Sequence, residues 1–173
     1  MVDISFVGKQ SIRLKGKSIT FIVDPTRKMS KTSADAIILL NGSDNADVSR
    51  VTDSRITIDG PGGYEVGGAK ISATLTPKGT LYRLSIDGID IIIGYATEAK
   101  AEGFNSCQVL IVNADNDFNE SFVTALEPKI TVLYGDKKNE SAKTLGLENV
   151  ASTSKILVVK DKLPEKMEIV VLD

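Results

Sequence analysis

The 173-residue sequence contains no histidine, no tryptophan and a single cysteine, Cys107. Without histidine, the usual serine–histidine–aspartate and cysteine–histidine nucleophile systems are excluded, as are imidazole zinc ligands and a histidine general base. One cysteine rules out an internal disulfide and a thiolate zinc site, and it is typical of a reducing compartment. The chemistry that remains is that of carboxylates, lysine, tyrosine and hydroxyl groups, or of a metal bound by oxygen ligands.

Strong net charge and long apolar segments are also missing. The chain has 21 basic and 23 acidic residues, which gives a net charge of −2, and no apolar run of 18 residues. This balance offers no broad basic surface, so nucleic-acid binding is not expected, and no segment is long enough to span a membrane. The N-terminus lacks the apolar region of a signal peptide. We therefore expect a cytoplasmic protein whose length fits a single domain over residues 1–173.

Short segments rich in β-branched residues dominate the first half of the chain. Ile4–Val7, Ser11–Leu14 and Ser18–Asp24 are separated by turns that contain glycine, and they predict an antiparallel meander. The continuous apolar run Ala34–Leu40 predicts a strand buried on both faces. The segment Gly60–Gly68 contains five glycines and one proline, which predicts a turn-rich element. Further strands are expected at Arg55–Ile58, Ala69–Leu75, Leu81–Ile86 and Asp90–Gly94.

In the second half, predicted strands alternate with predicted helices. This change of pattern, without a linker or low-complexity segment, predicts an α+β fold in which two sheets pack together with helices outside. Two apolar strands, Ile89–Ile93 and Glu168–Leu172, could pair with a second copy of the chain if they lie at sheet edges, which would make a homo-oligomer. The other strands are expected at Cys107–Val112, Lys129–Tyr134 and Lys155–Val159, and the helices at Asn119–Leu126 and Glu140–Leu145.

Several local motifs follow one another in an order that resembles the metallo-β-lactamase superfamily, and within it the small branch of predicted zinc-dependent hydrolases. The most specific match is Gly-Pro-Gly-Gly-Tyr-Glu-Val at residues 60–66. The resemblance implies a four-layer αββα sandwich, reduced in size, and hydrolysis at a two-zinc centre. The other matching segments are Ile4–Gly8, Ser11–Lys15, Ile22–Pro25, Ala34–Leu40, Glu127–Ile130 and Lys160–Pro164.

The positions at which this family carries its metal ligands hold other residues here. The motif His-x-His-x-Asp-His falls on residues 43–48, where Asp47 alone keeps a ligand type. A histidine of the first hairpin is replaced by Lys9, which we expect to neutralise Asp24 and Asp47 in place of the metal. The resemblance therefore implies a vestigial metal site with these members: Asp24, Ser43, Asn45, Asp47, Val48, Tyr95, and Tyr134 or Gly135.

The residues at this site determine which metal ions it could bind. Zinc, which the resemblance implies, is not supported, because one aspartate cannot replace the four ligands that zinc needs. Calcium or magnesium could be held by Asp44, Asn45 and Asp47, although the same residue types are ordinary in a polar loop. The segment Asn113–Glu120 opens like a calcium loop, but it lacks the glycine and the final glutamate, which favours a loop that caps a helix.

Two hypotheses about function follow. In the first, which the missing histidines favour, the chain is a degenerate, metal-free domain that acts as a binding or assembly module and is not an enzyme. In the second, it remains a metal-dependent hydrolase that uses a site without histidine, either an oxygen-ligated metal or a pair of lysine and tyrosine side chains. The sequence assigns no catalytic residue, substrate or partner.

Overall fold

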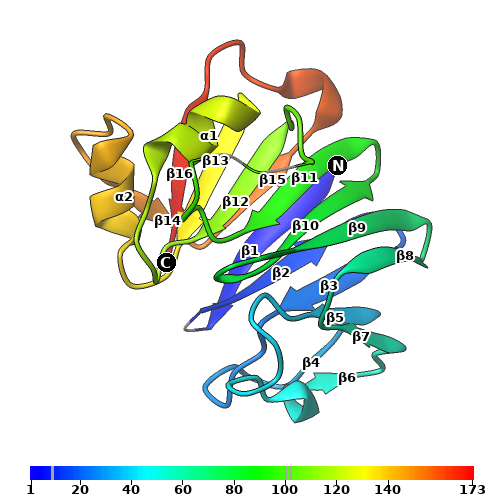
Figure 1. Ribbon diagram of the computed structural model, residues 1–173. Coiled ribbons are helices and arrows are strands. Elements are labelled where there is room, and N and C mark those ends of the chain that lie inside the picture. Colours follow the sequence, from blue (N-terminus) through cyan, green and yellow to red (C-terminus); the bar gives the residue numbers. More distant parts are fainter. Residues whose placement is uncertain (9, 100, 102) are drawn as a thin grey trace.

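Two β-sheets packed face to face form the body of the molecule in the computed structural model, which describes every residue except Lys9, Lys100 and Glu102 (Figure 1). One sheet has six strands and the other has eight. The six-stranded sheet contains, in spatial order, β15 (Lys155–Val158), β1 (Val2–Gly8), β2 (Ser11–Lys15), β3 (Thr20–Val23), β5 (Ala36–Ile38) and β7 (Ile56–Ile58). The eight-stranded sheet contains β14 (Ser152–Thr153), β16 (Glu168–Leu172), β13 (Ile130–Tyr134), β12 (Val109–Asn113), β11 (Ile89–Gly94), β10 (Gly79–Ile86), β9 (Ala69–Thr76) and β8 (Gly62–Val66).

The main hydrophobic core lies between the two sheets. Side chains alternate along each strand, so that Phe21 and Ile38 of the first sheet meet Ile91 and Ile111 of the second in one buried cluster. Tyr82 also joins the sheets, because its hydroxyl donates to the carbonyl oxygen of Leu39 over 2.8 Å. The two sheets are thus joined by a hydrogen bond as well as by apolar packing.

Two helices cover the outer face of the eight-stranded sheet. These are α1 (Glu120–Leu126), which Asn119 caps by accepting from the Ser121 N–H, and α2 (Lys138–Thr144). Their apolar faces pack on a second cluster that includes Leu110 and Leu133. None of the helices in the described part of the chain is long and apolar enough to cross a bilayer.

The outer face of the six-stranded sheet is covered differently. Met29, Ala34 and Val51 pack over Ile22 and Ile37 in a third, small cluster. Met29 lies in the loop after β3, and the other two lie at a minor sheet of β4 (Thr32–Ser33) and β6 (Val51–Thr52). Ala34 directly follows β4, and Val51 begins β6, directly after a 3₁₀ helix at Val48–Arg50. The predicted α+β sandwich is confirmed, with its outer layer on this side reduced to short elements. A second 3₁₀ helix lies at Lys160–Lys162.

The strand pairing corrects several expectations. The meander β1–β2–β3 is antiparallel as predicted, but β3, β5 and β7 pair in parallel. The glycine-rich segment predicted as a turn contains the edge strand β8, because only its Gly67-Gly68 end makes the turn into β9. The two strands considered as free edges are internal: β11 lies between β10 and β12, and β16 lies between β13 and β14.

One pairing connects distant parts of the chain. The first strand, β1, has β2 on one side and β15 on the other, with Val2 opposite Val158. The C-terminal part of the chain thus completes the sheet that the N-terminal strands begin.

Candidate functional site

A small polar cleft lies where strands of both sheets end. Its volume is about 200 Å³. Asp24 follows β3, Tyr95 follows β11, and Asn113 and Asp115 lie at the end of β12. Strand ends are where α/β folds commonly place ligands, because loops of different strands converge there. We call this site the polar cleft, and its lining residues are Gln10, Asp24, Thr26, Asn41, Gly42, Asn45, Ala46, Tyr95, Asn113 and Asp115.

Asp24 is fixed at the floor of the polar cleft by the ends of three strands. Its backbone N–H donates to the Ile38 carbonyl over 2.9 Å, and its own carbonyl accepts from the Ser11 hydroxyl over 2.7 Å. Its carboxylate accepts from the Leu40 N–H over 2.9 Å. Burial raises the pKa of Asp24 to about 7, the Leu40 N–H opposes that rise, and the nearby Asp115 adds to it. This carboxyl group therefore changes charge near neutral pH.

Asp115 faces Asp24 from the other sheet. Its carboxylate accepts from the Asp136 N–H over 2.7 Å, and its backbone N–H donates to the Asn113 side chain over 3.1 Å. Gly135 makes this position possible, because a Cβ atom there would lie 2.6 Å from the Asp115 carboxylate oxygen. Gly135 also has a φ of +100°, which favours glycine. The end of β13 is thus shaped to admit the Asp115 side chain.

Two tyrosines complete the surroundings of the carboxylates. Burial raises the pKa of Tyr95 to about 12, with a further contribution from Asp24 and Asp115. Tyr134 is fully buried, and among the described residues no hydrogen bond of normal geometry reaches its hydroxyl, although the Asn113 side chain lies near it. Burial raises the pKa of Tyr134 well above its ordinary value, Asp24, Tyr95 and Asp115 raise it further, and the Asn113 side chain opposes them. Tyr134 does not line the polar cleft, so its effect on the site is through the neighbouring Asn113 and the two carboxylates.

A second, more open pocket of about 450 Å³ adjoins the polar cleft. It contains Asp47, the one ligand type left in the predicted metal motif, together with Arg27 and Lys28. The Asp47 carboxylate accepts from the Ser49 hydroxyl over 2.5 Å and lies 3.6 Å from the Arg50 guanidinium. The Ser49 hydroxyl is the main reason that the pKa of Asp47 is lowered. Asp47 is therefore engaged by its own loop and does not line the polar cleft.

The vestigial metal site predicted from the sequence is divided by the structure. Asp24, Asn45 and Tyr95 line the polar cleft, Tyr134 lies against its carboxylates, and Gly135 lies against Asp115. The other predicted members, Ser43, Asp47 and Val48, line no part of it. Lys9, the predicted charge substitute, lies outside the described residues.

Sequence reasoning missed Asp115, Asn113 and Asn41. Asn113 and Asp115 were interpreted only as part of a loop that caps the following helix. A signal was available, because each of the three stands at or within a few residues of the end of a buried apolar strand. Without the strand order, however, the sequence does not say which strand ends meet.

The donor groups of the polar cleft do not fit a zinc centre. In the part of the chain that the structure describes, no three side chains of aspartate, glutamate or cysteine converge as a metal site, and the sequence has no histidine. The cleft offers two carboxylates, side-chain amides and a phenol. Zinc sites use about four nitrogen, sulfur or oxygen ligands, with imidazole or thiolate prominent among them. The described residues of this cleft therefore offer acidic groups and hydrogen-bonding groups.

Comparison with known proteins places this geometry in a known fold. No family model and no curated protein matches the sequence. Among solved structures, one from Thermotoga maritima, assigned to the zinc-dependent hydrolases of the metallo-β-lactamase superfamily, is similar with a TM-score of 0.77 and 18% identity, over 99% of this chain and 98% of that one. The metallo hydrolase Igni18 from Ignicoccus hospitalis gives 0.60 and 12%, over 92% and 99% of the two chains.

A third similar structure is the metallo-β-lactamase fold protein YhfI from Bacillus subtilis, with a TM-score of 0.58 and 10% identity over 99% of this chain and 96% of that one. At these identities the likeness concerns the fold, and it extends over nearly the whole length of each chain. The two packed sheets and their outer helices thus belong to one known architecture: the chain has the metallo-β-lactamase fold.

Proposed function

We propose that this protein is a degenerate member of its fold that works without a metal, as a binding or assembly module whose ligand occupies the polar cleft. One observation carries the proposal: the strand ends of a fold shared with metallo hydrolases here present Asp24, Tyr95 and Asp115 in a chain with no histidine. Two carboxylates are too few to hold zinc with useful affinity.

The way these groups are held also favours binding over metal catalysis. Asp24 already accepts from the Leu40 N–H, and Asp115 already accepts from the Asp136 N–H. Tyr95 is backed by Gly79, where an added Cβ atom would lie 3.1 Å from the tyrosine ring. A pre-formed set of polar groups at the bottom of a cleft is the usual design of a small-molecule site.

Elemental analysis of the purified protein tests the proposal. The protein would be produced in medium supplemented with zinc, manganese, iron and magnesium, dialysed, and analysed for bound metal. We expect far less than one equivalent of any metal per chain, and no rise in melting temperature when zinc is added. A stoichiometric metal that disappears in both Asp24→Asn and Asp115→Asn would overturn the proposal.

The second candidate function is a hydrolase that uses these same carboxylates. It is favoured by the raised pKa of Asp24, since a carboxyl group that titrates near neutral pH can act as a general acid or base. Hydrolysis of simple phosphate and carboxylic esters, measured with EDTA and with added magnesium, checks this function. Turnover that is abolished by Asp115→Asn would favour the hydrolase over the binding module.

A further inference from the structure

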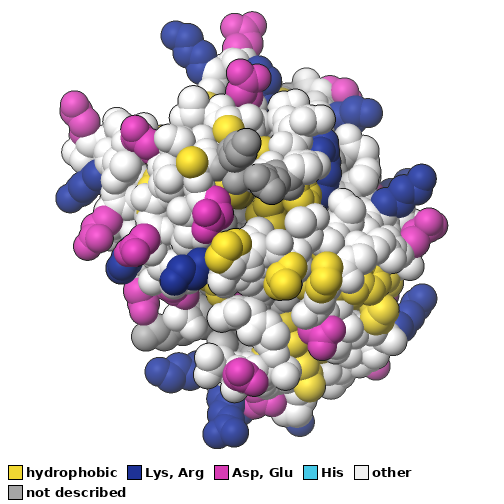
Figure 2. All heavy atoms as spheres, in the orientation of Figure 1, with side chains coloured by type: hydrophobic (Ala, Val, Ile, Leu, Met, Phe, Trp, Pro, Cys, Tyr) yellow, Lys and Arg dark blue, Asp and Glu magenta, His cyan; other side chains and the backbone are white. Residues whose placement is uncertain are grey.

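An apolar groove adjoins the polar cleft and shares one wall with it. The groove has a volume of about 440 Å³ and lies between the β9–β10 hairpin and the loop after β11. Tyr95 lines both the groove and the polar cleft. Figure 2 shows hydrophobic side chains gathered on this face in the middle of the view. The apolar side chains of the groove include Leu75, Pro77, Leu81, Ala101, Phe104 and Phe122.

The sizes of the two spaces suggest that they are used together. Ligand pockets commonly have volumes of about 300–1,000 Å³, and the polar cleft alone is smaller than this range. A ligand with only its polar group in the cleft has an apolar surface within reach on the other side of Tyr95. Leu75, which is 66% exposed, lies in that surface and gains most from being covered.

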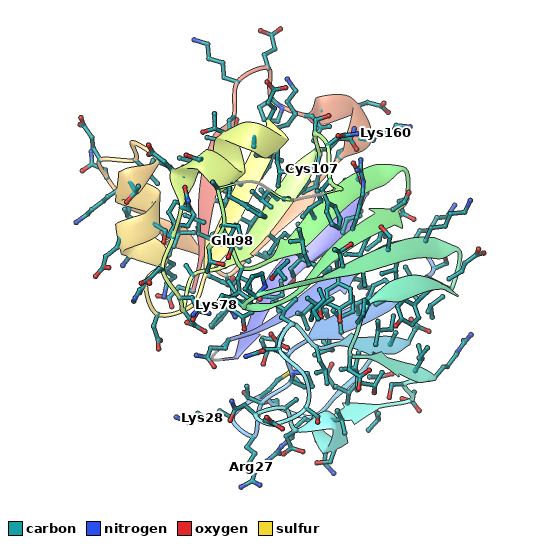
Figure 3. The ribbon with its side chains drawn as sticks, in the orientation of Figure 1. Arg27, Lys28, Lys78, Glu98, Cys107 and Lys160 are labelled. Atoms are coloured by element: carbon teal, nitrogen blue, oxygen red, sulfur yellow. The ribbon has the colours of Figure 1, made fainter. Side chains whose placement is uncertain are left out.

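All the charged side chains that line the two spaces, among the residues that the structure describes, are acidic. Asp24 and Asp115 line the polar cleft, and Glu98 lines the groove. Among the described residues that line either space there is no lysine or arginine. Figure 3 shows Glu98 on the loop after β11 and Lys78 at the tip of the β9–β10 hairpin, and Lys78 does not line the groove. Charge complementarity therefore favours a cation.

The polar groups specify what kind of cation fits. Beside the two carboxylates, the polar side chains that line the cleft are the Tyr95 phenol and the amides of Gln10, Asn41, Asn45 and Asn113. A primary ammonium group has three N–H donors, which can be shared among the Asp24 and Asp115 carboxylates and the oxygen of a tyrosine hydroxyl or a side-chain amide. A carboxylate or phosphate head group would instead meet two acidic side chains.

We propose that the site takes an amphiphilic primary amine, with the ammonium group in the polar cleft between Asp24 and Asp115 and the apolar chain in the groove beyond Tyr95. The inference rests on the proposed binding function and names the ligand class. It depends on the side chains of Asp24, Asp115 and Tyr95 and involves no metal.

Calorimetric titration of the full-length protein with four probes tests the proposal at near-neutral pH and constant ionic strength. The probes are n-octylamine, n-octanol, n-octanoate and n-butylamine, each below its micelle concentration. We expect octylamine to bind at least about tenfold more tightly than octanol, because a charge-assisted hydrogen bond is stronger than a neutral one. Butylamine should bind more weakly than octylamine, by up to about fourfold per missing methylene, and octanoate should not bind.

Three variants test which space binds the ammonium group and which binds the apolar chain. Asp115→Asn should weaken octylamine about tenfold and leave octanol unchanged. Leu75→Ala, at a position whose side chain is 66% exposed, should weaken both octylamine and octanol. Asp117→Asn removes a carboxylate whose side chain is fully exposed and should change neither, so it is the matched control.

The outcomes separate this inference from the function on which it rests. Equal binding of octylamine and octanoate, or octylamine binding that Asp115→Asn and Leu75→Ala both leave unchanged, would overturn the ligand class while the protein remains metal-free. A stoichiometric metal in the purified protein would instead overturn the proposed function itself. If Asp115→Asn does not fold, Asp24→Asn provides the same comparison between amine and alcohol.

Discussion

At the scale of single residues, Asp24 makes stability depend on pH. Its pKa is about 7 in the folded protein, above its ordinary value of 3.8, because burial disfavours the charged form. The stability that it contributes is therefore complete below about pH 4 and is lost as the pH rises through about 7. The upper bound of this loss is about 4 kcal/mol in the free energy of unfolding.

Replacing Asp24 by asparagine should remove much of that loss. The amide oxygen can still accept from the Leu40 N–H, but it has no charge to bury. Urea unfolding of the wild type should give a lower free energy at about pH 8 than at about pH 5, and Asp24→Asn should show a smaller difference. The exposed Asp117→Asn variant is the control, and an identical pH profile for wild type and Asp24→Asn would contradict the assignment.

Gly135 is a second residue whose role can be measured. Gly135→Ala introduces a Cβ atom 2.6 Å from the Asp115 carboxylate, at a φ of +100°. Gly146 has a similar φ of +91° and nothing within 4 Å of the corresponding Cβ position, so Gly146→Ala measures the backbone strain alone. We expect Gly135→Ala to lower the free energy of unfolding by about 1–3 kcal/mol more than Gly146→Ala. Equal losses in thermal unfolding would mean that the contact with Asp115 costs nothing.

At the scale of elements, Tyr82 connects β10 to the opposite sheet. Its hydroxyl donates to the Leu39 carbonyl over 2.8 Å and lies 3.3 Å from the Ile58 carbonyl. Tyr82→Phe keeps the ring in the core and removes this hydrogen bond from a fully buried place. The free energy of unfolding should fall by about 1–2 kcal/mol.

Tyr64→Phe is the matched control, because the Tyr64 hydroxyl bonds to Gly60 in a partly exposed turn where water can replace it. Its effect should be smaller than that of Tyr82→Phe in the same urea experiment. A larger effect for Tyr64→Phe would show that the connection between the sheets is not an important hydrogen bond.

Most elements could be predicted from the sequence, because apolar periodicity and turn residues are local signals. The closing strand at Glu168–Leu172 was located with its observed bounds. The strand β8 was not, since its glycines resemble a turn, and it is stabilised by pairing with β9. The parallel order of β3, β5 and β7 was also beyond reach, because pairing partners are set by tertiary contacts.

At the scale of the whole molecule, the fold was more predictable than the site. Motifs spread along the chain indicated the architecture, and the structure confirms it. The polar cleft depends on which strand ends converge, and so Asp115 was assigned to a helix-capping loop although it faces Asp24. Asp47 was predicted to belong to the site but lies outside the cleft. Its hydrogen bond to Ser49 and its ion pair with Arg50 are local contacts within its own loop.

The pairing of β1 with β15 has a consequence for how the protein is made. One edge of β1 stays open until residues 155–158 have left the ribosome, since Val158 is the partner of Val2. Contacts between residues so far apart in sequence slow folding, because a long loop must close before they form. The first sheet therefore passes through synthesis with an unpaired edge on β1, and such an edge can pair with another chain until β15 covers it.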